Sequence, residues 1–190
     1  MATTHNETDD LITELVKDHD EVRAIFDRLS PTAAGPADER AELVRRMTVE
    51  LVKHSVAEEA YLYPLIRKVL PDGDRLADHE IEEHAEVERL LKDLEDLEPA
   101  DPLYDEKLGK VIDDVRHHAR EEEDVVFPQL RDECSPDELL ELGDKVRTIK
   151  KIAPTHPHPS APDTPPANLI AGPMAGIVDR VRDALARLSD

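Results

Sequence analysis

Apolar residues recur every three or four positions along most of the chain, and this spacing predicts amphipathic α-helices. Four such stretches lie at about 9–29, 43–69, 74–97 and 103–132, and segments that contain Pro or Gly separate them. Helices of about 20 to 30 residues with short connections pack as antiparallel neighbours. The pattern therefore predicts an all-α fold, with an up-down-up-down four-helix bundle in residues 1–132.

The remainder of the chain predicts further helical elements. Ser135-Pro136-Asp137 has the residues of a helix start, so residues 133–153 should contain a short accessory helix. Residues 154–172 form a Pro-rich linker, and residues 173–190 carry one apolar stripe of a C-terminal amphipathic helix. That helix should cover its stripe on the bundle, on a second copy as a homodimer, or on another partner.

The bundle sequence is a duplication of one helical hairpin. The segment from His54 to Pro64 (HSVAEEAYLYP) returns 64 residues later, from His118 to Pro128 (HAREEEDVVFP). Upstream, residues 17–22 (KDHDEV) are echoed 65 residues later by residues 82–87 (EEHAEV). Each half therefore carries one lone His and then one His-x-x-x-Glu. The two prolines remove a backbone donor, so a kink or an early helix end is expected at each.

The repeated polar residues are candidate metal ligands. Residues i and i+4 of a helix share one face, so each His-x-x-x-Glu can direct two ligands into the bundle. Each lone His is followed by apolar residues at +3, +6 and +7, which places it on an apolar face. Buried carboxylates without a cation would cost several kcal/mol each. The candidate ligands are His19, His54, Glu58, His84, His118 and Glu122.

Two other His-x-x-x-Glu matches, His79/Glu83 and His117/Glu121, do not belong to the repeat. In so acidic a chain such matches arise by chance, and we interpret these two as solvated i,i+4 pairs.

The ligand set favours two transition-metal ions. Mixed imidazole and carboxylate donors suit iron, manganese or zinc and are a poor match for calcium. Four histidines provide two per ion, and Glu58 and Glu122 can each bridge both ions. Such a set leaves open positions, which indicates reactivity with a small molecule. Two Fe ions with an oxo or hydroxo bridge are the favoured cofactor, with Mn or Zn as substitutes.

With these motifs, residues 10–132 resemble the hemerythrin-like, or HHE cation-binding, domains. The resemblance implies a four-helix bundle around a di-iron centre that meets O₂, peroxide or nitric oxide. Oxygen-carrying members have a second His on the third helix, four residues from the first. Here Glu80 and Glu88 stand at −4 and +4 from His84, and Glu88 enters the expected ligand set. In the carriers the fourth-helix carboxylate follows its His by five residues, whereas Glu122 follows His118 by four. These departures disfavour reversible oxygen carriage.

Tyr61 is the candidate catalytic residue. It follows Glu58 by three residues and His54 by seven, so α-helical geometry places it on their face. A phenol there could hydrogen-bond a bound oxygen species or ligate ferric iron. The alternative is a core tyrosine with its hydroxyl at the rim.

Composition limits the partners. The net charge of −21 argues against nucleic acid or anionic membrane. One cysteine, Cys134, cannot form an internal disulfide, and residues 1–10 lack an apolar signal region. No apolar run is long enough to span a membrane. A cytoplasmic location is the expectation.

Three functions remain open. The leading interpretation is a non-haem di-iron protein that binds or consumes O₂, hydrogen peroxide or nitric oxide. Whether it is an enzyme stays open; turnover would be peroxide decomposition, as in a catalase, or ferroxidase-like oxidation. The alternative is an iron- or oxygen-sensing module that signals through its C-terminal helix. The third is an interaction bundle whose acidic surface collects cations.

Overall fold

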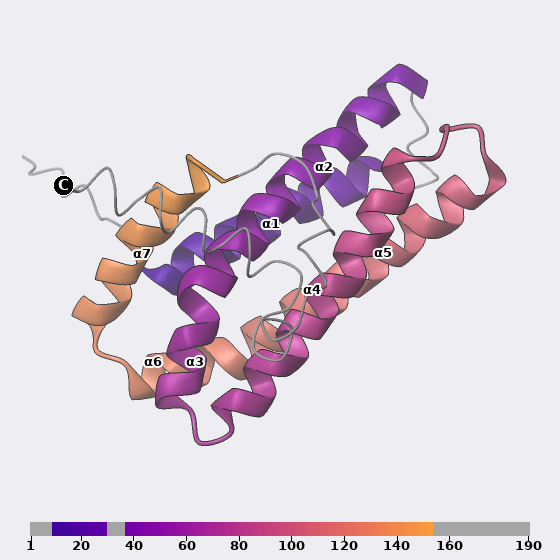
Figure 1. The fold of residues 1–190 in the computed structure, drawn as a ribbon. Helices are drawn as coiled ribbons and strands as arrows, with labels where there is room; N and C mark the ends of the chain where they lie inside the picture. The colour runs from indigo at the N-terminus through magenta and orange to yellow at the C-terminus, as the bar shows by residue number, and fades with distance from the viewer. Residues whose placement is uncertain (1–8, 30–36, 154–190) are drawn as a thin grey trace, which may run out of the picture.

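The computed structural model describes residues 9–29 and 37–153, and every described element is helical (Figure 1). The linker at 154–172 and the amphipathic helix at 173–190 lie outside the described residues. The helices are α1 (Leu11–Leu29), α2 (Ala37–Ala57), α3 (Tyr63–Val69), α4 (Gly73–Glu95), α5 (Pro102–Glu121), α6 (Phe127–Glu133) and α7 (Pro136–Lys150). Two π-helical turns, η2 (Glu58–Leu62) and η3 (Glu122–Val126), join α2 to α3 and α5 to α6.

The four long helical rods of the bundle are α1, α2–η2–α3, α4 and α5–η3–α6, as Figure 1 shows. The helical bundle predicted from the sequence is confirmed. Within the described ranges, no helix combines the length and the apolar character needed to cross a membrane.

Buried apolar residues form two clusters, one toward each end of the bundle. Core A surrounds Leu15 and Leu130, and core B surrounds Phe26 and Leu108. Along each rod, one repeated histidine lies between the residues of core A and those of core B. The polar positions of the repeat therefore form one buried layer between two apolar cores.

The π turns are the local response to Pro64 and Pro128. Proline has no N–H, so the carbonyl four residues earlier loses its α-helical donor and the ring crowds it. The backbone N–H of Tyr63 instead bonds the carbonyl of Glu58, five residues back, and Phe127 bonds Glu122 in the same way. The sequence predicts a kink or an early helix end at each proline; the regular α-helix does stop before it, but the chain widens into one π turn and then continues as α-helix.

The accessory helix α7 begins as the sequence predicts and packs on the first half of the bundle. The Ser135 side chain accepts a hydrogen bond from the Glu138 backbone N–H at 3.2 Å. The backbone leading into α1 approaches so closely that a Cβ at Gly143 would lie 2.3 Å from the carbonyl oxygen of Asp9. Val146 is fully buried in core A. The helix is thus part of the packed body.

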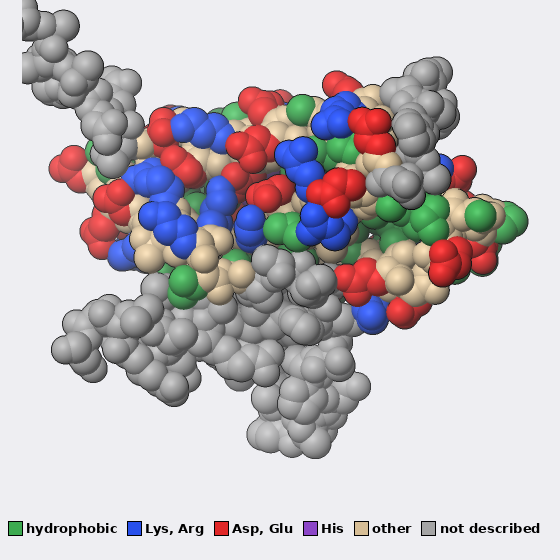
Figure 2. All heavy atoms as spheres, turned by 90° about the horizontal axis from the view of Figure 1, so that it is seen from above, with side chains coloured by type: hydrophobic (Ala, Val, Ile, Leu, Met, Phe, Trp, Pro, Cys, Tyr) green, Lys and Arg blue, Asp and Glu red, His purple; other side chains and the backbone are tan. Residues whose placement is uncertain are grey.

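Surface charges are mixed. On the face in Figure 2, Lys and Arg side chains are interspersed among Asp and Glu side chains. Many form short-range helical ion pairs, such as Arg45 with Glu42 at 2.6 Å and Lys145 with Glu141 at 2.7 Å. Each such exposed pair contributes little stability.

Candidate metal centre

The four repeated histidines meet in two pairs in the buried layer. The Nε2 atoms of His19 and His54 are 3.2 Å apart, and those of His84 and His118 are also 3.2 Å apart. Two nitrogens about 2.1 Å from one metal ion, at an angle of about 90–110°, lie roughly 3.0–3.4 Å from each other. Each pair therefore has the spacing of two ligands on one ion.

Two fully buried carboxylates connect the pairs. Glu58 places Oε1 2.9 Å from Nε2 of His54 and Oε2 3.2 Å from Nε2 of His84. Glu122 places Oε2 3.4 Å from Nε2 of His19 and 3.8 Å from Nε2 of His118. Both side chains have no exposed surface. Each carboxylate thus lies where it can bridge two ions, one per histidine pair.

The hydrogen-bond geometry fits metal ions. None of the four carboxylate oxygens of Glu58 and Glu122 has a hydrogen-bond partner, although imidazole nitrogens lie close to them. Fully buried carboxylate oxygens without partners are costly, and a cation between oxygens and nitrogens removes that cost. The carboxylate oxygens and imidazole nitrogens converge on shared points and do not form hydrogen bonds with one another. The residues present fit two ions with mixed nitrogen and oxygen ligands.

Outer carboxylates orient the imidazoles with the same symmetry as the repeat. His54 Nδ1 donates to Asp18 at 3.2 Å, and His118 Nδ1 donates to Glu83 at 3.0 Å. In each case the acceptor directly precedes a lone His of the repeat. His19 Nδ1 donates to Glu123 at 2.7 Å. Because the outer nitrogen carries the proton, Nε2 is free to face the centre.

The charges of the cluster depend on one another. Burial lowers the pKa of His54, but attraction to Glu58 and its bond to Asp18 outweigh burial and raise the pKa to about 10. Burial raises the pKa of Glu58, but the charge of His54 and the other imidazoles beside it outweigh burial and hold the pKa well below its usual range. Burial and repulsion by Glu58 raise the pKa of Glu122. Protons on the imidazoles supply the positive charge here, and a metal ion would displace them.

The expected position of Tyr61 is wrong. Tyr61 lines an outer groove with residues of α3 and α7, such as Lys68 and Glu141, away from the histidines. In the π turn η2 the i,i+5 spacing replaces i,i+4, so the residue above Glu58 is Tyr63, and Tyr63 faces the site in place of Tyr61. The Tyr63 hydroxyl lies 2.9 Å from Nε2 of His84, and its side chain is almost fully buried. Pro64 was the sequence signal for this change.

The expected ligand Glu88 also lies outside the cluster. It is buried in a small pocket beside Leu91, and no group of candidate ligands among the described residues includes it. Its alternative, Glu80, lies with His118 and Glu122, and its Oε2 is 2.9 Å from Nδ1 of His118. The reason is chain direction. The helices that carry Glu58 and Glu122 run from core B toward core A, so each Glu follows its histidine. Helix α4 runs the opposite way, so the glutamate on the same side of the histidine layer, Glu80, precedes His84.

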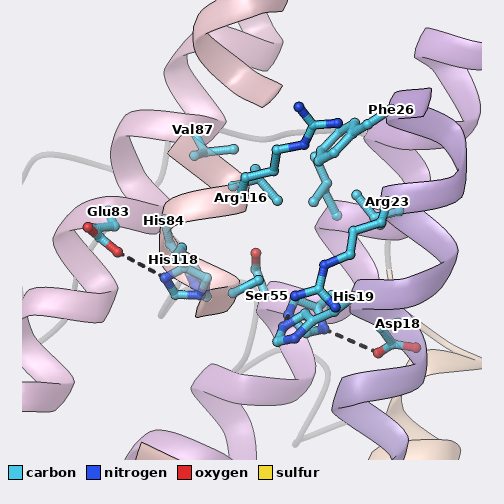
Figure 3. Close-up of a pocket in the computed structure, with 15 residues that line it drawn as sticks. Asp18, His19, Arg23, Phe26, Ser55, Glu83, His84, Val87, Arg116 and His118 are labelled. Carbon is cyan, nitrogen blue, oxygen red and sulfur yellow. Dashed lines mark hydrogen bonds and ion pairs between the residues drawn. The ribbon is translucent and has the colours of Figure 1, made fainter. Parts of the chain in front are cut away.

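A small pocket lies over the four imidazoles (Figure 3). Its volume of about 30 Å³ is room for roughly two water-sized molecules. Figure 3 shows Arg116 and Phe26 above the histidines, and the Arg116 guanidinium lies 5.6 Å from the centre of the Phe26 ring. Arg23 donates to Glu123 at 2.8 Å, the carboxylate that also orients His19. Apolar side chains complete the wall: Val22, Phe26, Leu51, Val87, Val115 and Ala119.

Comparisons with known proteins agree with this geometry. The family model described as the hemerythrin HHE cation binding domain matches residues 10–130. An uncharacterized hemerythrin-like protein of Schizosaccharomyces pombe is 29% identical over 174 residues, which is 91% of this chain and 85% of that protein. A DNA nickase of Nostoc sp. is 26% identical over 133 residues, which is 70% of this chain but 37% of that protein.

The fold also has a counterpart among solved structures. The crystal structure of a hemerythrin HHE cation binding domain-containing protein from Mycobacterium kansasii superposes with a TM-score of 0.64 at 22% identity. The match covers 76% of this chain and 86% of that one. At this identity the likeness concerns the fold alone.

Proposed function

Because the chain belongs to the hemerythrin HHE cation-binding family, we propose that its buried cluster holds two iron ions that bind or consume a small oxygen or nitrogen species. The candidate ligands are O₂, hydrogen peroxide and nitric oxide. One observation carries the proposal. Glu58 and Glu122 are fully buried, have no hydrogen-bond partner for any carboxylate oxygen, and each lie between two histidine pairs.

Each ion would take one histidine pair. His19 and His54 would hold the first ion, and His84 and His118 the second, with the two carboxylates shared. Iron, when bound, supplies redox chemistry that zinc lacks, and its preference for nitrogen and oxygen donors suits this set. Manganese and zinc are substitutes with the same ligands.

The pocket supports a ligand of two or three atoms. A volume of about 30 Å³ is room for dioxygen, peroxide or nitric oxide. The apolar wall limits the number of competing waters, which strengthens electrostatic interactions between a bound ligand and the cluster beneath the pocket. The guanidinium of Arg23 is held by Glu123, and that pair lies against His19 at the pocket wall.

Tyr63 takes the role that the sequence assigned to Tyr61. Burial and the nearby carboxylates, Glu58 first among them, raise the pKa of Tyr63 well above its ordinary value, so its hydroxyl keeps its proton. That hydroxyl is beside Nε2 of His84, the nitrogen that faces the second ion. Tyr63 belongs to core A and does not line the pocket, so its hydroxyl can donate a hydrogen bond or a proton to an oxygen species bound on the core A side of the histidines, a step that peroxide decomposition uses.

The sensing alternative depends on the C-terminal helix at 173–190, which lies outside the described residues. No contact in the described part of the chain favours it. Nicking activity belongs to the Nostoc protein, of which the match covers 37%. A net charge of −21 disfavours binding to a DNA backbone, so we do not transfer that activity.

The experiment is metal analysis with optical spectroscopy on untagged protein from iron-supplied cells. We expect two irons per chain and a near-ultraviolet charge-transfer band that added peroxide perturbs. Zinc, or well under one metal per chain with no such band, would overturn the proposal.

A further inference from the structure

Two His-x-x-x-Glu pairs that the repeat does not contain meet on the outer face of α4 and α5. His79 and Glu83 lie one turn apart on α4, and His117 and Glu121 lie one turn apart on α5. Nε2 of His79 is 3.7 Å from an oxygen of Glu83 and 3.7 Å from Oε2 of Glu121. Nε2 of His117 is 3.4 Å from that same Glu121 oxygen. The sequence interpretation as separate solvated pairs misses this meeting of two helices.

The spacing is that of ligands on one ion. Separations of 3.4–3.7 Å between nitrogen and oxygen are too long for good hydrogen bonds. Ligand atoms about 2.0–2.2 Å from a tetrahedral ion lie roughly 3.3–3.6 Å apart. Oε2 of Glu121 is itself shielded from solvent and has no hydrogen-bond partner. The atoms are thus arranged around a shared point and not paired with one another.

The carboxylates at this place, Glu83 and Glu121, face histidines and no Lys or Arg of the described residues. His79 and His117 are about half exposed, with 48% and 60% of their side-chain surface open to solvent. An ion from solution can therefore reach the cluster.

We propose that His79, Glu83 and Glu121, whose ligand atoms lie within 4.8 Å of one another, form a separate mononuclear site for a divalent transition-metal ion, with His117 beside it through its contact with Glu121. One imidazole and two carboxylates, with a second imidazole next to them, suit Zn²⁺, Mn²⁺, Fe²⁺ or Co²⁺ better than Ca²⁺ or Mg²⁺, which prefer oxygen ligands alone. The site lies outside the buried cluster and shares no bridging ligand with it.

Glu83 connects this outer site to the buried one. Its Oε1 faces His79, and its Oε2 accepts the hydrogen bond from Nδ1 of His118. The same side chain lines the pocket over the imidazoles. An ion held by Glu83 is therefore one side chain from the buried centre, and we assign the outer site the role of staging ions for that centre. This role rests on the proposed di-metal function, whereas binding at the outer site does not.

The binding test is equilibrium dialysis of iron-loaded protein against Zn²⁺, with metals counted by mass spectrometry. Wild-type protein should hold one Zn²⁺ per chain beyond its iron. The double variant His79→Ala/His117→Ala should keep its iron and bind that Zn²⁺ at least about tenfold more weakly. Both histidines are exposed, so the fold should survive, and circular dichroism checks this.

The matched control is His156→Ala/His158→Ala, which removes the same number of imidazoles from the Pro-rich segment and should keep the extra Zn²⁺. Equal Zn²⁺ binding by the His79→Ala/His117→Ala variant and wild type would overturn the proposal, as would absence of an extra ion in wild type. If the protein carries no iron, the same titration is run on metal-free chain. Zinc lost in His79→Ala/His117→Ala but retained in His54→Ala then reports the outer site alone.

The staging role is tested by the rate of Fe²⁺ uptake into metal-free protein, followed at the near-ultraviolet band. The double variant should reach the same final iron content about tenfold more slowly. An unchanged rate would remove the staging role.

Discussion

The two halves of the bundle repeat the same buried His and Glu residues and have different outer faces. In the first half, the positions equivalent to His79 and Glu83 are Glu14 and Asp18. Helix α7 covers them: Arg147 pairs with Glu14 at 3.0 Å, and Lys150 pairs with Asp18. In the second half no described helix provides such cations, and histidines occupy the equivalent place.

The carboxylate charges are balanced in one way inside the bundle and in another way on its surface. Inside the bundle, both halves present buried carboxylates to imidazoles, because the repeat duplicates the inner face. Outside, the first half satisfies its carboxylates with side chains of α7, whereas the second half offers them to an ion. A duplicated hairpin thus acquires different surface chemistry from an element that only one half contacts.

The halves also differ at one inner position. Tyr63 follows the π turn of the first half and approaches His84, whereas Phe127 follows the second and stacks over His19 at 6.1 Å. A hydroxyl is therefore present beside one histidine pair and an apolar ring beside the other. The two ions would have unequal surroundings although their ligands are alike.

The largest effect should come from removing an inner ligand from either half. Since the pairs are equivalent, His54→Ala and His118→Ala should each lower the metal content from two ions per chain to at most one. Glu58→Ala should do the same because its oxygens face both pairs. Metal analysis measures this, with His79→Ala as the control that retains both buried ions. Two ions in any of the three variants would show that the ligand assignment is wrong.

A smaller effect should come from removing the Tyr63 hydroxyl, which the second half lacks. Tyr63→Phe reproduces the Phe127 side and should lower peroxide turnover about 10²-fold, the usual contribution of a positioned proton donor. The metal content should not change. Tyr61→Phe, two residues away in the outer groove, should leave both quantities as they are. A loss of turnover in Tyr61→Phe but not in Tyr63→Phe would restore the assignment made from sequence.

The smallest effect should come from uncovering the outer face of the first half. Lys150→Ala removes the cation beside Asp18, and both side chains are largely buried. We expect the free energy of unfolding to fall by about 1 kcal/mol, measured by urea denaturation of metal-free protein. Lys145→Ala breaks the exposed pair with Glu141 on the same helix and should cost close to nothing. Equal losses in the two variants would mean that α7 does not balance Asp18.

Much of the centre could be predicted because the repeat and the helical period act locally. The spacing His54-x-x-x-Glu58 places both side chains on one face in any α-helix. The lone histidines lie between apolar positions, so burying those positions buries the histidines too. The all-α bundle and the cluster of His19, His84 and the two pairs were readable for these reasons.

The two residues that the sequence placed wrongly depend on non-local contacts or on non-standard helix geometry. Tyr61 was placed by i,i+3 spacing, which the π turn before Pro64 changes by one residue. Glu88 and Glu80 are equivalent by periodicity, and only the direction of α4 relative to its neighbours selects Glu80.

The sequence by itself determined the helices, their duplication and the six repeated His and Glu positions that meet in the buried layer, because apolar period and residue spacing are properties of single helices. The tertiary structure decided which tyrosine faces the histidines, which acidic residue of α4 accompanies them and which outer face α7 neutralises. It also decided that His79 and Glu121, on different helices, lie side by side. Those outcomes depend on how separate helices are aligned and rotated against one another, which packing of the two cores fixes and no local pattern encodes.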